Sequence, residues 1–309
     1  MNKIGNFGFN ALHSSLHTEG YFYDNHHDDG DFIKTIPAAK NWVLKRVECS
    51  TKSGANNRFE FAFIPNNGFL QSPDLLMKDC ELKLSFDRAK AVIALTKVKE
   101  STPPDNIAIL DCHAVTEYIS SPGLRNHFDS IERQPITYGY EEMEVLIKNL
   151  PTNTTNVQIE NIRGGNVPKY MFVGLIPSVN LQGDYAKGAT CFQQHKVEEL
   201  NITLSGNSVS GYPIKVSHES PIFPMHKFLD TTGRLYNVLA DKGPCYTSFR
   251  TFMWIWSHKF EAEMTSQGWI GMNLKLSEAF TEQMSMVIWI VSPNALTMDK
   301  YHQIEKINL

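Results

Sequence analysis

Histidine and carboxylate side chains lie next to one another in the run His26-His27-Asp28-Asp29 near the N-terminus. Imidazole and carboxylate groups both bind divalent metal ions, so this run is the first candidate for a metal site. It lies in a polar stretch without a regular element that would hold its ligands in a coordination geometry. We therefore interpret the run as part of a flexible segment and predict no metal site.

Other histidines are scattered along the chain, and no H-x-H or H-E-x-x-H motif pairs them. A metal enzyme of the cupin type would need three of the histidine and acidic side chains to converge on one strand face. An isolated histidine on a strand is more often a hydrogen-bonded structural residue. The histidines in question are His113, His195, His218, His226, His258 and His302.

A glycine pair, Gly164-Gly165, is the nearest approach to a phosphate-binding loop, but neither G-x-G-x-x-G nor G-K-[ST] is present. The pair leads through Pro168 toward a strand rather than a helix, so we interpret it as a tight turn. No G-x-S-x-G elbow for a nucleophilic serine occurs. Cys112 and His113 are sequence neighbours, which is no evidence for a catalytic dyad.

Adjacent carboxylates occur at Glu141-Glu142 and at Glu198-Glu199. Neighbouring residues of a strand point to opposite faces, so neither pair is arranged for general acid–base catalysis. We interpret them as solvated edge charges or interface charges. The sequence therefore predicts no catalytic, cofactor-binding or metal-binding residue, no cofactor, and a protein that is not an enzyme.

The chain has 309 residues, of which 42% are hydrophobic and 20% charged, with a formal net charge of −4. These values are typical of a globular protein with a sizeable core, and no block of lysine and arginine indicates nucleic-acid binding. The five cysteines are widely spaced and form no C-x-x-C motif, which favours reduced thiols. No apolar run reaches the about 20 residues of a membrane-spanning helix.

An aromatic group near the C-terminal end could form a stacking platform for nucleic acid or sugar. Only Arg250 and Lys259 lie near it, so we favour core packing, with a subunit interface as the other place where such side chains concentrate. The group consists of Phe249, Phe252, Trp254, Trp256, Trp269 and Trp289.

Short alternating segments separated by Gly, Asn and Pro predict an all-β protein. From Leu200 to Leu204 apolar and polar residues alternate strictly, as in a strand with one solvated face. Residues 107–119 form a long strand pattern that we expect to bend near Asp111. A loop is expected at Pro177–Gly188, and one helix at Pro221–Asp241. Strands are expected at 42–48, 58–64, 80–86, 107–119, 135–147, 157–162, 169–176, 191–204, 246–256, 269–276, 284–292 and 296–307.

These elements favour a jelly-roll β-sandwich with one inserted helix near 225–240. We expect a flexible N-terminal arm over residues 1–35 and an N-terminal β segment over 36–105, which is either partial or a compact first jelly roll. The C-terminal jelly-roll domain is expected over 106–309. One complete roll with extra N-terminal strands and a compact double jelly roll both remain open.

The order of several segments resembles a known family. From about Ile107 to Leu309 the chain is similar to the C-terminal jelly roll of double jelly-roll capsid-like proteins from Polinton (Maverick) elements and related animal DNA viruses. Phe59–Phe86 is similar to the opening strands of their first jelly roll. The segments are PITYGYEEMEVLIKNLPTN, NIRGGNVPKYMFVGLIPSVNLQGDY, CFQQHKVEELNITLSGNSVSGYPI, HKFLDTTGRLYN and GWIGMNLKLSEAFTEQMSMVIWIVSPNALTMD.

The resemblance implies a structural protein that self-assembles into trimers or higher capsomers and so into a viral or virus-derived shell. Its partners would be copies of itself and other capsid proteins, and its location the virion, or the host cytoplasm or nucleus for a retained gene. Two alternatives stay open. One is a carbohydrate- or protein-binding β-sandwich with an aromatic groove around Trp254 and Trp269, and the other is a cupin-like metal enzyme.

Overall fold

The computed structural model describes side chains in residues 135–183, 188, 190–216, 222–233, 249, 253–260, 267–299, 301 and 303–307. For Asn308 and the strands before residue 121 it describes the backbone. The chain divides into two compact units. One contains Met143–Ser292, and the other contains Phe9–Glu142 with Pro293–Leu309. The run His26-His27-Asp28-Asp29 and most of the expected arm lie outside the described residues.

The second unit contains short antiparallel sheets. One three-stranded sheet has the order β4-β3-β7, another has the order β5-β2-β8, and β1 pairs with β6. The register between β3 and β7 shifts between Arg46 and Val47, opposite Asp111 and Ile109, so the bend expected near Asp111 is present as a bulge. The strands are β1 Gly20–Tyr21, β2 Phe32–Thr35, β3 Trp42–Ser50, β4 Asn56–Phe63, β5 Leu75–Leu76, β6 Lys83–Leu84, β7 Asn106–Val115 and β8 Glu117–Ser120.

Two larger sheets form the first unit. In one of them β11 pairs with β15 and β17, and β9 also pairs with β17. Strand β18 pairs with the end of β17, Asn294–Met298, and both of these segments belong to the second unit. The other sheet contains β10, β16 and β12, with β13 and β14 both pairing with β12. The strands are β9 Ile136–Leu150, β10 Asn156–Asn166, β11 Tyr170–Pro177, β12 Val197–Leu204, β13 Asn207–Ser208, β14 Ile214–Lys215, β15 Ile255–Lys259, β16 Gln267–Leu276, β17 Met284–Met298 and β18 Ile304–Asn308.

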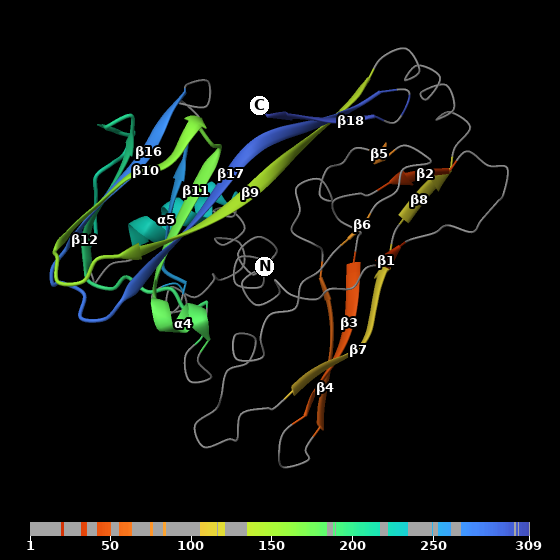
Figure 1. Cartoon of the computed structure of the whole chain (residues 1–309), viewed down its shortest axis with the longest axis horizontal. Coiled ribbons are helices and arrows are strands. Elements are labelled where there is room, and N and C mark those ends of the chain that lie inside the picture. The colour runs from red at the N-terminus through yellow and green to blue at the C-terminus, as the bar shows by residue number, and fades with distance from the viewer. Residues whose placement is uncertain are drawn as a thin grey trace. The chain divides into compact units, whose positions relative to one another are not determined.

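The chain alternates between these two sheets. Strands β9 and β10 lie in different sheets, and the same holds for β11 and β12, for β14 and β15, and for β16 and β17. All the strand pairings with a defined register are antiparallel. This order of two Greek keys is the jelly roll, so the predicted fold class is confirmed. Figure 1 shows the two sheets in green to blue, with β9 and β17 side by side.

Strand β11 forms the centre of its sheet, between β15 and β17. Its run from Met171 to Pro177 is buried on both faces, as its continuous apolar sequence predicts. A glycine is required at position 174, since a β-carbon there would lie 2.5 Å from Cδ1 of Phe192. The ring of Phe192 also packs edge-on against Trp289 at 5.3 Å between centroids, so this face is covered by the segment before β12.

Helices occupy two of the connections in the described part of the chain. Helix α5, Ile222–Thr231, is the expected helix, and it ends before Gly233, which has a φ of 67°. The connection expected to be a plain loop at Pro177–Gly188 contains a short helix instead, α4 Ser178–Gln182. The strand expected from residue 246 begins only at Ile255, and Phe249 has a helical backbone.

The glycine pair is not a tight turn. Gly164 and Gly165 lie inside β10 and pair with Trp269 and Gly268 of β16. The irregularity lies a few residues earlier, where the register shifts between Ile159 and Arg163 and Asn161 adopts a φ of 52°. The prediction of a tight turn was wrong because glycine also occurs within strands, at a bulge or where another segment approaches the backbone closely.

One end of the sandwich is tied together by hydrogen bonds between distant loops. The side-chain amide of Gln283 donates to the carbonyl oxygen of Leu150 at 2.8 Å. Ser285 donates through its hydroxyl to Asn149 Oδ1 at 3.1 Å, and Ser178 Oγ lies 2.7 Å from Ser285 Oγ. These bonds connect the end of β9, the start of β17 and the start of α4.

Candidate functional site

A cluster of polar side chains lies where α5 crosses β15. Thr231 Oγ1 lies 3.1 Å from Ser257 Oγ, and Tyr212 donates through its hydroxyl to the carbonyl oxygen of Ser257 at 3.1 Å. The Tyr212 ring packs edge-on against His258 at 5.1 Å, and the ammonium of Lys227 lies 4.9 Å from the centre of the Tyr212 ring. The cluster therefore connects α5, the connection before β14 and the edge strand β15.

The environment of this cluster disfavours charge. Burial, and then the nearby Lys227 ammonium, lower the pKa of His258 from 6.5 to about 4. Burial lowers the pKa of Lys227, partly offset by the Asp230 carboxylate, and burial raises the pKa of the Tyr212 phenol. His258 is therefore neutral at pH 7, and Nε2 of its ring is buried without a hydrogen-bond partner.

These groups do not form a metal centre or a catalytic dyad. His258 is 5% exposed and packs edge-on against Phe260 at 4.4 Å, so its ring is enclosed by other rings. Among the residues whose side chains are described, no three His, Cys, Asp or Glu side chains lie close enough to share a metal ion. The geometry supports a structural role, in which the cluster fixes α5 to the edge of the sandwich.

Two further histidines, His195 and His226, have side chains in the described part of the structure. His195 is half-buried beside β12, and burial lowers its pKa, partly offset by Glu282. His226 is exposed on α5. His113 lies on β7, where only the backbone is described, and His218 and His302 lie outside the described residues.

One carboxylate of each adjacent couple, Glu142 and Glu198, forms an ion pair. Glu142 Oε2 lies 2.7 Å from the Lys306 ammonium and also accepts a hydrogen bond from the Asn294 amide. Glu198 lies 3.9 Å from Lys275 across β12 and β16. Both ion pairs are solvent-exposed, so each contributes little to stability.

Most of the aromatic group belongs to the core, as predicted. Trp254, Trp256 and Trp289 are 0%, 1% and 4% exposed, and Phe249 packs at 5.7 Å from Trp254. A groove around Trp254 is therefore excluded. Trp269 is different, since it lies on β16 with half of its surface exposed. Phe252 and Arg250 lie outside the described residues.

Several apolar side chains are exposed, and they are the candidates for an assembly surface. None of them was predicted from the sequence as a site residue. Val145 and Ile147 on β9 are 49% and 57% exposed, and Ile222 and Phe223 on α5 are 58% and 50% exposed. Exposed apolar groups of this kind mark interaction surfaces when they gather. Val145 and Ile147 are two residues apart, which predicts that they share one face of the strand. The sequence does not show whether other elements bury that face.

The described helices are too short and too polar to span a membrane. No family model matches the sequence. The chain is 20% identical to an uncharacterized protein of Caenorhabditis elegans over 237 residues, which is 76% of this chain and 52% of that protein. The chain thus spans about half the length of this curated relative.

Among solved structures, the chain is similar to PBCV-1 VP54, as fitted into a cryo-EM reconstruction of the virophage Sputnik. The TM-score is 0.56 at 12% identity, over 94% of this chain and 93% of that chain. A quasi-atomic model of the PBCV-1 virus capsid matches with the same values. The chain therefore has a jelly-roll fold similar to that of the PBCV-1 capsid protein VP54.

Proposed function

We propose that the protein is a structural, capsid-like protein that self-assembles through its jelly-roll units into a viral or virus-derived shell. The observation that carries the proposal is the likeness to VP54, which extends over nearly the whole of both chains. The order of the segments from about Ile107 to Leu309, which resembles that in Polinton capsid-like proteins, supports an origin in such an element. Its partners would then be copies of itself in trimers or larger capsomers, and other capsid proteins.

The exposed apolar pair on β9 provides a place where such an assembly could bury surface. Val145 and Ile147 point to the same side of the strand, and obligate interfaces are built on apolar patches of this kind. In the described part of the sheet β9 pairs with β17 on one side and with no strand on the other, so β9 is an edge strand. An edge strand with an apolar face is a ready surface for association.

The full chain should form oligomers in solution. Size-exclusion chromatography with light scattering, followed by negative-stain microscopy over a range of salt and pH, should detect trimers or larger particles. The double variant Val145→Lys/Ile147→Lys should shift the population toward the monomer while leaving the tryptophan fluorescence unchanged. Ser210→Lys, a charge at another exposed position, is the matched control.

A strict monomer under every condition would contradict the proposal. If the double variant still forms the same oligomers, the proposal of self-assembly stands, but the β9 surface at Val145 and Ile147 is not the interface. The domain limits 1–35, 36–105 and 106–309 stay predictions, and limited proteolysis with mass spectrometry of the fragments tests them. A carbohydrate- or protein-binding module is the second candidate function, and the exposure of Trp269 favours it.

A further inference from the structure

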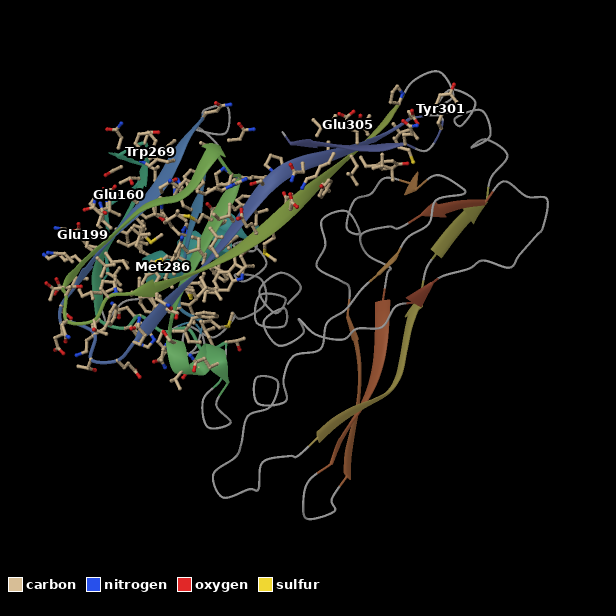
Figure 2. All side chains as sticks on the ribbon, in the orientation of Figure 1. Glu160, Glu199, Trp269, Met286, Tyr301 and Glu305 are labelled. Carbon is tan, nitrogen blue, oxygen red and sulfur yellow. The ribbon has the colours of Figure 1, made fainter. Side chains whose placement is uncertain are left out.

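The pairing of β16 with β10 and β12 places the Trp269 side chain on the solvent-exposed face of the sheet. It is 50% exposed, whereas the neighbouring residues Ile270 and Met272 are 1% and 0% exposed and belong to the core. Figure 2 shows Trp269, Glu160 and Glu199 on the outer side of the β10–β16–β12 sheet, away from Met286 in the core. A large apolar ring kept on a solvated sheet face is a candidate binding element.

The backbone around the indole carries almost no bulk. The partner of Trp269 on β10 is Gly164, and the next residue on the same side of β16 is Gly271. A β-carbon at Gly271 would lie 2.7 Å from Thr203 Oγ1 and 3.3 Å from the carbonyl oxygen of Ile159, so a larger residue here would displace the Thr203 side chain. On β12, Ser205 donates its backbone N–H to the Trp269 carbonyl oxygen at 2.8 Å. The indole therefore has Gly164 beside it on β10, while the Thr203 hydroxyl lies close to Gly271 on the β12 side.

Amide and hydroxyl groups continue the same face beyond the glycine. Asn273 is paired with Gln158 on β10 and with Asn201 on β12, so three amides form a row across the sheet. Gln158 donates to a Glu160 carboxylate oxygen at 2.8 Å, and Asn201 donates to Ser208 Oγ at 2.9 Å. Such groups can both donate and accept hydrogen bonds.

The charges of this face disfavour a polyanion. Three carboxylates lie on or beside this face in its described part, Glu160, Glu198 and Glu199. Two cations lie next to them, since Lys275 is 3.9 Å from Glu198 and Lys215 is the strand partner of Glu199. Single-stranded nucleic acid binds where a positively charged groove accompanies the stacking rings. The face offers carboxylate acceptors instead, which suits a ligand that carries many hydroxyl donors.

We propose that the outer face of β10, β16 and β12 binds a neutral oligosaccharide. The C–H face of one pyranose ring would stack on the indole of Trp269. Hydroxyl groups of that ring and of the next would donate to Glu160 and exchange hydrogen bonds with Gln158 and Asn273. A few polar groups beside an aromatic surface is the usual composition of a small-ligand site. This site is independent of the assembly proposed above.

Cellotriose, triacetylchitotriose and mannotriose are the probes, with a hyaluronan tetrasaccharide as the anionic comparison. Saturation-transfer NMR and calorimetry on the full chain should show binding of at least one neutral trisaccharide, with the hyaluronan fragment weaker. Trp269→Ala should weaken that binding at least tenfold, and Trp269→Tyr by about threefold, because tyrosine keeps an aromatic face. Glu160→Gln should weaken it by about fivefold.

Tyr301→Ala is the matched control, because Tyr301 is a more exposed aromatic residue remote from β16 in the sequence, and it should leave binding unchanged. Failure of all three neutral probes to bind the wild-type chain would overturn the proposal. Binding that Trp269→Ala leaves at the wild-type strength would overturn it too. Loss of self-association in Trp269→Ala without any saccharide binding would assign the face to a second copy of the chain and overturn the proposal equally.

Discussion

Replacing Phe228 by alanine should lower the free energy of unfolding of the Met143–Ser292 unit by about 3–5 kcal/mol. Phe228 is 1% exposed, and its ring lies 6.0 Å from that of Phe172 on β11 and 5.9 Å from that of Phe249. Removing the ring would leave a cavity between α5 and the sheet. Urea unfolding followed by tryptophan fluorescence measures the change, because Trp254, Trp256 and Trp289 lie in this core.

Phe223→Ala is the control on the same helix. Phe223 is 50% exposed, so its removal should cost no more than about 1 kcal/mol. The two variants remove the same side chain from one helix and differ mainly in burial. Equal and small losses in the two variants would show that the Phe228 ring does not pack between α5 and β11.

The second large effect is a loss of stability in acid that depends on His258. Its pKa is lowered from 6.5 to about 4 in the folded protein, so folding favours the neutral ring. The stabilisation is complete above pH 6.5, and it is lost as the pH falls toward 4, because the unfolded chain binds the proton first. The loss over this range should be about 3 kcal/mol.

His258→Phe should flatten that part of the pH profile, measured by urea unfolding at pH 7, 6, 5 and 4. Lys227→Met should reduce the slope without removing it, because burial is the larger cause of the lowered pKa and the Lys227 charge the smaller. His226→Gln, at an exposed position on α5, is the control and should follow the wild type. The lowered pKa of His195 also reduces stability as the pH falls. The test is therefore the difference in pH dependence between the wild type and His258→Phe. A wild-type profile that is flat between pH 7 and 4 would contradict this account of the cluster.

The strands that the sequence predicted best are those with strong local patterns. The continuous apolar run of β11 and the alternation of Leu200 and Ile202 in β12 both depend on burial that repeats along the chain, which periodicity detects. The expected strand from residue 191 was too long, because His195 and Lys196 have φ values of 50° and 67° and break the extended backbone before Val197. Such dihedral angles depend on neighbours that a local pattern does not contain.

The local sequence around each tryptophan did not predict whether its side chain is buried or exposed. Trp254 and Trp269 are each followed by an isoleucine in the sequence, yet Trp254 is fully buried while Trp269 lies on the solvated face of β16. The difference follows from the pairing of β16 with β10, which places Gly164 opposite the indole. The polar cluster at His258 was missed for the same reason, since Tyr212 and Lys227 come from other elements.

The closing strands of the roll have a consequence for synthesis of the chain. Strand β9 comes first among the strands of these two sheets, but its partner in the sheet is β17, which follows after seven intervening described strands and precedes only β18. Gln283 and Leu150, joined by a hydrogen bond, are 133 residues apart in sequence. A ribosome would therefore have to release nearly the whole roll before β9 could find its neighbour. Such non-local pairing makes folding slow, so a nascent β9 with its exposed apolar face would need protection from other unfinished chains.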